Sequence, residues 1–465
     1  MKEKARWIIP ILSVVATAWI AVAGPMYEVF LTVDFEAATF TGTMHIIYTD
    51  RTPDRLSEVL FRLLPNGGGI YGDASIDVSG VSVDGRPVEA DLTAGGTALR
   101  VPLPTPLGPD ESVVIDLEFT GEAARASDPG SSGYGVLTKS ERALTLSAFY
   151  PILAVYDEKR GWNLDPVPTF GDALTADYAS YEATVTADAD LGLAASGRLI
   201  DSTITATEGT YRFSLPGGRD FAIVVLAGYE MEEEVLGDFT IRSWFYPEDR
   251  SAASIARRLA IEALALYEGT IGDLPMSEID IVEVPLHRAA GVESSGLILI
   301  SSEYAKRPED PFYDVIVSHE VAHQWFYNIV GNDTLEDPWL DEGLVSYLSY
   351  VFLEKTRRDA AAEEQRRGWE ISYEAAQEEY DDLSVTAALS EFPDVSSYTS
   401  YVYSGGALLF DAIRREIGDE AFFNALSDYY EANAGRIATP ESLIAAFERA
   451  CGHSLTRIFS RFADR

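Results

Sequence analysis

The stretch His319–Glu342, HEVAHQWFYNIVGNDTLEDPWLDE, decides how the rest of the chain is organised. His319 and His323 are four residues apart, so on a helix both imidazoles lie on one face, one turn apart. Glu320 directly follows the first histidine and completes an H-E-x-x-H pattern. Two neutral imidazoles bind zinc, and the carboxylate between them is placed to accept a proton from water. The stretch therefore predicts a zinc centre on a helix.

The helix that carries the two histidines is expected to begin at Pro311 and to be closed by Gly331, because proline suits the first helical position and glycine suits the end. Apolar residues between them follow a helical spacing: Val315, Ile316, Ala322, Phe326 and Ile329. The alternative is a chance match of structural histidines. Burying two imidazoles and a carboxylate without partners would be costly, which favours the metal.

A third ligand is expected on a second helix, since a catalytic zinc usually takes three protein ligands and keeps one position open. Glu342 lies just after Pro338, and the polar loop 331–337 would let the second helix turn back against the first. The residues that follow Glu342 have the apolar spacing of a helix: Leu344, Tyr347, Leu348 and Val351.

HEVAHQWF followed by PWLDEG resembles the gluzincin zinc aminopeptidases, the family of membrane alanyl aminopeptidase and leukotriene hydrolase. Their shared pattern is H-E-x-x-H, eighteen residues, then E, and eighteen residues separate His323 from Glu342 here. The resemblance implies one Zn²⁺ per chain, with His319, His323 and Glu342 as ligands. It also implies that Glu320 is the general base.

Two further motifs of that family have counterparts in this chain. The upstream G-x-M-E-N motif appears as AGVES at 290–294, with Val292 in place of methionine. The downstream tyrosine, which precedes a K-G-A turn, appears as Tyr403, with Gly405 where lysine is common. The resemblance implies that Glu293 binds the α-ammonium of the substrate, that Gly291 and Val292 contact the substrate, and that Tyr403 donates a hydrogen bond to the oxyanion.

Length and composition limit the classes of protein. A chain of 465 residues with 47% hydrophobic residues is expected to form two or three folded domains. The formal net charge of −40 disfavours nucleic acids and anionic membrane surfaces as partners, because both would be repelled. Cys451 is the single cysteine, so no intrachain disulfide exists. The oligomeric state does not follow from the sequence.

Residues 1–24 have the pattern of a signal peptide or an N-terminal membrane anchor. Three basic residues, Lys2, Lys4 and Arg6, precede an apolar run over 7–23 that ends in small residues. Cleavage and retention as a single-pass anchor both stay open. In either case the positive flank stays inside, and the rest of the chain is expected outside the cytoplasmic membrane, secreted or anchored.

The remaining pattern predicts an α+β chain. Residues 25–235 alternate between apolar and polar residues and are broken by turn clusters, which predicts an N-terminal, mainly antiparallel β sandwich or saddle. Residues 236–465 predict a small sheet and then a mainly helical region, and the resemblance implies a thermolysin-like catalytic domain. Larger members of that family carry further domains beyond this point. The resemblance thus implies a short two-domain member with a more open cleft.

Three functions remain open at this point. The first is a zinc aminopeptidase that acts on peptides with a free N-terminus, which Glu293 favours because a carboxylate can pair with an ammonium. The second is another zinc hydrolase on the same scaffold, either an endopeptidase or an epoxide hydrolase. The third is a non-catalytic interaction protein, which the intact set of ligands argues against.

Overall fold

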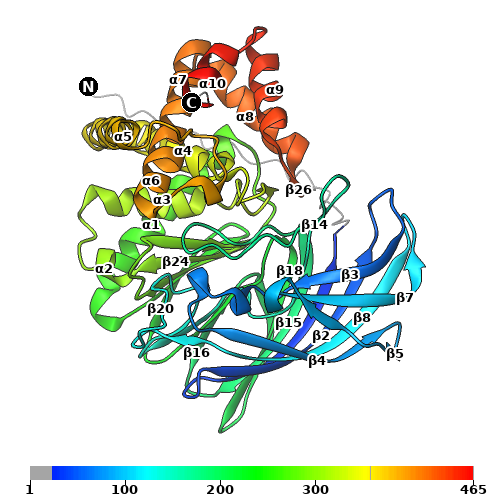
Figure 1. Ribbon diagram of the computed structural model, residues 1–465. Helices are drawn as coiled ribbons and strands as arrows, with labels where there is room; N and C mark the ends of the chain where they lie inside the picture. Colours follow the sequence, from blue (N-terminus) through cyan, green and yellow to red (C-terminus); the bar gives the residue numbers. More distant parts are fainter. Residues whose placement is uncertain (1–23, 357, 464–465) are drawn as a thin grey trace.

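The computed structural model describes residues 24–356 and 358–463 and confirms the α+β prediction, with a β-rich first half and a mainly helical second half (Figure 1). The expected signal or anchor segment lies outside the described residues, except for Gly24. Among the described residues, no helix combines the length and the apolar character that a membrane span requires.

The N-terminal half consists of packed sheets whose strands alternate between buried and exposed residues. In β1, Tyr27, Val29, Leu31 and Val33 are buried and the residues between them are exposed. The largest sheet has eight strands, antiparallel except for the β1–β15 pair. In sheet order they are β17 (Arg198–Ile204), β18 (Glu208–Gly218), β15 (Ala179–Asp188), β1 (Met26–Asp34), β2 (Thr39–Thr49), β8 (Ser112–Glu122), β4 (Ser75–Val83) and β5 (Arg86–Pro87).

Two smaller sheets and a hairpin complete this β domain. One sheet is β12 (Ile152–Leu153), β3 (Leu56–Arg62), β7 (Ala98–Leu107) and β6 (Asp91–Thr93). The other is β16 (Gly192–Ala195), β19 (Ile223–Leu226), β11 (Ala143–Leu146), β10 (Leu137–Lys139) and β9 (Ala124–Arg125). The hairpin pairs β13 (Tyr156–Asp157) with β14 (Gly161–Trp162).

A five-stranded sheet carries the functional half of the chain. Its order is β20 (Glu230–Leu236), β21 (Phe239–Phe245), β22 (Glu278–Val284), β24 (Leu297–Ser301) and β23 (Gly291–Ser294). All seven residues of β22 are buried, as expected for a strand that is covered on both faces. The short strand β23 lies antiparallel to β24 and forms one edge of the sheet. The predicted domain boundary at residue 235 stays a prediction.

Helix α1 lies in the chain between β21 and β22, the other helices follow the sheet, and together the helices cover one side of it (Figure 1). They are α1 (Arg250–Thr270), α2 (Ser302–Ala305), α3 (Pro311–Ala322), α4 (Glu342–Lys355), α5 (Asp359–Glu379), α6 (Val395–Tyr398), α7 (Gly406–Ile417), α8 (Asp419–Asn433), α9 (Pro440–Cys451) and α10 (Thr456–Ala463). A π-helical turn at Thr399–Gly405 joins α6 to α7. A two-stranded pair, β25 (Val330–Gly331) and β26 (Arg436–Ile437), ties the loop after α3 to the segment between α8 and α9.

Helix α3 ends at Ala322, so the expected continuation to Gly331 is wrong. The reason lies in Arg219, which follows β18 and is buried under the segment after α3. Its guanidinium donates hydrogen bonds to the carbonyls of Tyr327, Asn328 and Ile329 at 2.9–3.1 Å. These carbonyls therefore bond to Arg219, where a continuing helix would bond them to amides four residues on.

Candidate active site

Three side chains from two helices meet at the proposed metal position. His319 lies on α3, His323 is the residue that caps the C-terminal end of this helix, and Glu342 is the first residue of α4, which packs against α3. The Nε2 atoms of the two histidines are 3.2 Å apart. Glu342 Oε2 lies 3.2 Å from His319 Nε2 and 3.6 Å from His323 Nε2. Two imidazole nitrogens and a carboxylate oxygen thus face one point.

This group fits a single zinc ion. The ligand atoms of all three residues lie within 4.8 Å of one another, as is needed for atoms that each approach zinc to about 2.0–2.2 Å. Glu342 Oε2 is buried and has no hydrogen-bond donor among the described residues. A buried carboxylate oxygen without a donor is costly, and a metal ion at this point would satisfy it.

Helix α4 begins where it does because Asp341 caps it. The Asp341 carboxylate accepts a hydrogen bond from the backbone N–H of Glu342 at 2.8 Å, one of the N–H groups that have no partner within the helix at its start. This interaction fixes Glu342 in the first turn, with its side chain toward α3. Burial raises the pKa of Glu342, but the imidazoles of His319 and His323 beside its Oε2 atom outweigh it and hold that pKa below its usual value.

Glu320 lies on the buried side of α3, directly against strand β23. A β-carbon on Gly291 would come within 2.4 Å of Glu320 Oε1, so only glycine leaves room for this carboxylate. Glu320 Oε2 is buried and has no donor among the described residues. The structure thus places the predicted general base beside the edge strand and leaves one of its oxygens free.

Glu293 approaches the same point from β23. Carboxylate oxygens of Glu293 and Glu320 and a ring nitrogen of His323 lie within 4.8 Å of one another. Burial raises the pKa of Glu320 to about 8 and that of Glu293 to about 7, His323 lowers both, and neighbouring carboxylates raise them again. Two carboxylates this close, next to Glu342, hold their protons more tightly than usual, and a cation that enters the pocket would pair with them in place of those protons.

Buried amides hold β23 in this position. The Gln324 side chain donates to the carbonyl of Ser294 at 3.1 Å and accepts from the N–H of Gly296 at 2.9 Å. Ser295 Oγ lies 2.8 Å from Asn328 Oδ1. The turn between β23 and β24 is thereby fastened to the end of α3. This contact explains why residues near 293 and near 320 share one site.

Tyr403 reaches the metal group from the π-helical turn. Its hydroxyl donates a hydrogen bond to Glu342 Oε1 at 2.5 Å, and its ring is stacked on His319 with centroids 6.0 Å apart. Burial, with the charge of Glu342 second, raises the pKa of Tyr403 well above its usual value. The phenol therefore stays protonated and can act as a donor.

Glycines let the tyrosine come this close. A β-carbon on Gly406 would lie 2.7 Å from the α-carbon of Gly343, so α4 and α7 cross with their backbones nearly in contact. The neighbouring Gly405 takes the place of the lysine that is common in the resembling family. A β-carbon there would meet Tyr373 and Val385 at 2.8–2.9 Å, which leaves no room for a long side chain.

Val292 differs from its neighbours on β23. It borders the same cavity, yet its side chain packs against apolar residues of the β domain and of its interface with the catalytic sheet. Alternation along the strand explains this, because Gly291 and Glu293 share one face and Val292 points to the other. A contact of Val292 with substrate stays a prediction and would come from its backbone.

A cavity of about 380 Å³ connects these groups, and one of its carboxylates was not predicted from the sequence. Asp172 reaches it from the β domain, in a loop that precedes β15. Burial and then the charges of Glu293, Glu342 and Asp341 raise the pKa of Asp172 well above its usual value. No pattern marks Asp172 in the sequence. It belongs to the site only because the two halves of the chain pack together here.

Residues 258–462 match the model of the peptidase family M1 domain. This stretch contains α3, α4, Glu293 and Tyr403. Residues 258–462 are a peptidase family M1 domain.

Curated relatives of this M1 domain are aminopeptidases by name. Aminopeptidase M1-A of Oryza sativa subsp. japonica is 25% identical over 248 residues, which are 50% of this chain and 28% of that relative. Human endoplasmic reticulum aminopeptidase 2 is 21% identical over 218 residues, 44% of this chain and 22% of the relative. The match thus spans between a fifth and a third of the length of these relatives.

Solved structures share the fold of the whole described chain. An M1 zinc metallopeptidase mutant from Deinococcus radiodurans has a TM-score of 0.67 at 21% identity, and the alignment covers 95% of both chains. The same protein bound to a Tyr-Ser-Ala substrate has a TM-score of 0.66, also at 21% identity, with 94% of both chains covered. The β domain and the M1 domain thus occur together in this neighbour.

Proposed function

We propose that this chain is a zinc-dependent aminopeptidase that hydrolyses the N-terminal peptide bond of peptides. The observation that carries the proposal is the position of Glu293, whose carboxylate lies within 4.8 Å of Glu320 and His323 at the edge strand. An ammonium paired with Glu293 would place the first peptide bond of a substrate beside Glu320. The names of the matching relatives agree with this activity.

Each residue of the site has a separate role in the proposed reaction. Glu293 pairs with the substrate ammonium, and the open edge of β23 is available for hydrogen bonds to an extended peptide. Glu320 accepts a proton from the attacking water and returns it to the leaving nitrogen. The protonated Tyr403, whose single O–H bonds to Glu342 Oε1, would redirect this hydrogen bond to the carbonyl oxygen as that oxygen gains negative charge. When it is bound, zinc supplies a Lewis acid that polarises the scissile carbonyl and lowers the pKa of water.

Hydrolysis of aminoacyl p-nitroanilides tests the proposal. Wild-type protein is expected to release p-nitroaniline, to lose activity on dialysis against a chelator and to regain it when zinc is added back. An internally quenched peptide with a blocked N-terminus is the comparison. If the blocked peptide is cut internally and the anilides are not hydrolysed, the chain is an endopeptidase. Turnover of an epoxide with neither peptide reaction would support the epoxide hydrolase.

We also propose that the enzyme acts outside the cytoplasmic membrane. Support comes from the basic residues Lys2, Lys4 and Arg6 before the apolar run 7–23. Fractionation of cells that express the full chain, followed by N-terminal sequencing, tests this. Cytoplasmic protein that retains Met1 would contradict it.

A further inference from the structure

The loop between β22 and β23 carries Arg288 at a fixed place beside the active-site cavity. The backbone N–H groups of His287 and Arg288 both donate to the carbonyl of Gly133, at 2.9 and 3.0 Å. Ser301 holds the loop from the other side, because its hydroxyl donates to the carbonyl of Leu286 and its N–H donates to that of Ala290. The backbone that carries Arg288 is therefore held at both ends.

Arg288 is the only lysine or arginine among the described residues that line the 380 Å³ cavity. The carboxyl groups that line the cavity are Asp172, Glu293, Glu320 and Glu342. The guanidinium of Arg288 is exposed and forms no ion pair or hydrogen bond with any described residue. A single cation without a protein partner thus borders a cavity that is otherwise acidic.

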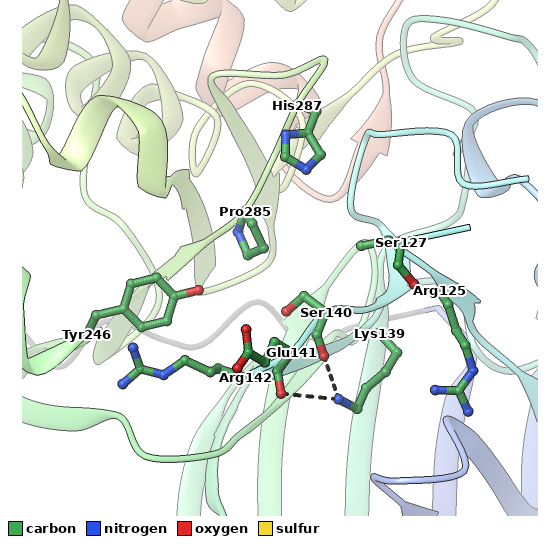
Figure 2. Close-up of a pocket in the computed structure, with 10 residues that line it drawn as sticks. Arg125, Ser127, Lys139, Ser140, Glu141, Arg142, Tyr246, Pro285 and His287 are labelled. Atoms are coloured by element: carbon green, nitrogen blue, oxygen red, sulfur yellow. Dashed lines mark hydrogen bonds between the residues drawn. The ribbon is translucent and has the colours of Figure 1, made fainter. Parts of the chain in front are cut away.

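The basic residues around a second cavity, on the other side of this loop, differ from Arg288 because they bond to acceptors of the protein. His287 and Pro285 border a second cavity with Arg125, Lys139 and Arg142 (Figure 2). Arg125 donates to the carbonyls of Glu36 and Ala37, and Lys139 donates to those of Ser140 and Glu141. Arg142 pairs with Glu248 at 3.2 Å. These cations bond to acceptors of the protein, so the second cavity is not comparable to the one beside Arg288.

The order of residues along β23 gives the direction in which a substrate would lie. Glu293 marks the end that binds the ammonium, and Gly291 lies against Glu320, where the bond would be cleaved. The leaving part of an extended peptide would continue past Gly291 toward Arg288. Arg288 lies five positions before Glu293 in the sequence, a reach of at most about 16–18 Å. Three or four peptide residues and an arginine side chain can bridge this distance.

We infer that Arg288 binds the C-terminal carboxylate of short peptides, so that the enzyme favours substrates of about three or four residues. This assignment rests on the proposed aminopeptidase function and adds a substrate class to it. The net charge of −40 repels a free carboxylate at long range, but screening limits that repulsion to about 8 Å at physiological salt. Within the cavity, Arg288 supplies the local attraction that a carboxylate needs.

Oligoalanines of two to five residues, each as free acid and as C-terminal amide, test the assignment. For wild type, the KM of the acid is expected to be about 1.5–5-fold lower than that of the amide at three or four residues, as an exposed ion pair provides. Arg288→Gln should lose this difference and leave the amides unchanged. The difference should also shrink in high salt, since screening weakens an exposed pair.

Arg86→Gln is the matched control, because Arg86 is exposed on β5, away from the cavity, and its loss changes the net charge equally. Equal KM values for acids and amides in wild type would overturn the assignment, as would the same loss in Arg86→Gln. If wild type releases alanine from none of the peptides, the proposed function fails and the assignment fails with it. If wild type cleaves the amides normally and shows no preference for the acids, the role of Arg288 is overturned and the proposed aminopeptidase function is not.

Discussion

At the scale of single residues, substitutions of Glu320 and of a metal ligand are expected to have different effects on zinc content and turnover. Glu320→Gln keeps the three ligands and removes the proton acceptor, so zinc content should stay near one per chain while kcat falls by about 10³-fold or more. His319→Ala removes a ligand and should lose zinc. Metal analysis and kinetics on both variants check this. Full zinc in His319→Ala, or near-normal turnover by Glu320→Gln, would contradict the roles.

A buried carboxylate outside the active site should make stability depend on pH. Glu283, on β22, is 6% exposed, and burial, with Asp249 as the next cause, raises its pKa to about 8. The folded chain then holds this proton more tightly than the unfolded chain does. The contribution of Glu283 to stability is therefore lost as pH rises from about 4.5 to about 8.

Glu283→Gln removes the titrating group. The Tm of the variant should match wild type near pH 5 and exceed it by a few degrees at pH 9. Thermal unfolding followed by circular dichroism across this range is the measurement. Parallel Tm curves for the two proteins would mean that the charge of Glu283 costs nothing in the folded state.

The predictability of site residues from sequence follows from how far apart they lie in the chain. His319, Glu320 and His323 are adjacent on one helix, so their spacing alone predicts a metal site. The sequence predicts Glu342 as the third ligand only through the family spacing of eighteen residues, and the structure places Glu342 at the start of α4. The sequence does not predict Asp172 or Arg288 as site residues, because no motif or spacing around them indicates a role. Asp172 reaches the cavity only through the packing of the β domain against the catalytic sheet, and the loop that carries Arg288 is bonded to Gly133 of the β domain.

At the scale of elements, the crossing of α4 and α7 positions Tyr403. Gly406→Ala would place a β-carbon 2.7 Å from Gly343, so the two helices must separate and shift the π-helical turn. Such overpacking costs about 1–3 kcal/mol, and a displacement of about 1 Å at the site can cost about 10²-fold in rate. We expect a lower Tm and a reduced kcat with zinc still bound.

Gly368→Ala provides the control for that variant. Gly368 lies within α5, and a β-carbon there would meet no atom within 4 Å. Alanine in this helix should raise stability by about 0.5–1 kcal/mol and leave kcat unchanged. Comparable kcat values for the two variants would show that the close approach of α4 and α7 does not position the tyrosine.

Helix ends were harder to predict than helix positions. The start of α3 is marked in the sequence by Asp310 and Pro311, which cap and open it. The path of the chain after this helix is fixed by Arg219, which lies about a hundred residues earlier and bonds to the carbonyls of residues 327–329. The local sequence pattern does not indicate a hydrogen-bond donor so distant in the chain. The pattern therefore predicts the end of α3 at Gly331, which is wrong.

At the scale of the whole molecule, Arg219 joins the two halves. It is 2% exposed, and besides the turn after α3 it donates to the carbonyls of Ala176 and Arg436 at 2.7–2.8 Å. Arg219→Gln would leave several buried carbonyls unpaired at about 1–3 kcal/mol each, so the Tm should fall by roughly 10 °C. Arg198→Gln, at an exposed position on β17, is the control. An unchanged Tm for Arg219→Gln would contradict this.

The central claim is that Glu293 anchors a free N-terminus, and one peptide tests it directly in two forms, free and N-acetylated. Wild type is expected to cleave the free form and to act poorly on the acetylated one, because only the free amine is charged. Glu293→Ala should reduce kcat/KM for the free peptide by about 10²–10³-fold, since a carboxylate–ammonium pair in a partly desolvated site is worth roughly 2–5 kcal/mol. The same substitution should hardly change kcat/KM for the acetylated peptide. Equal cleavage of both forms by wild type would contradict the claim and favour an endopeptidase.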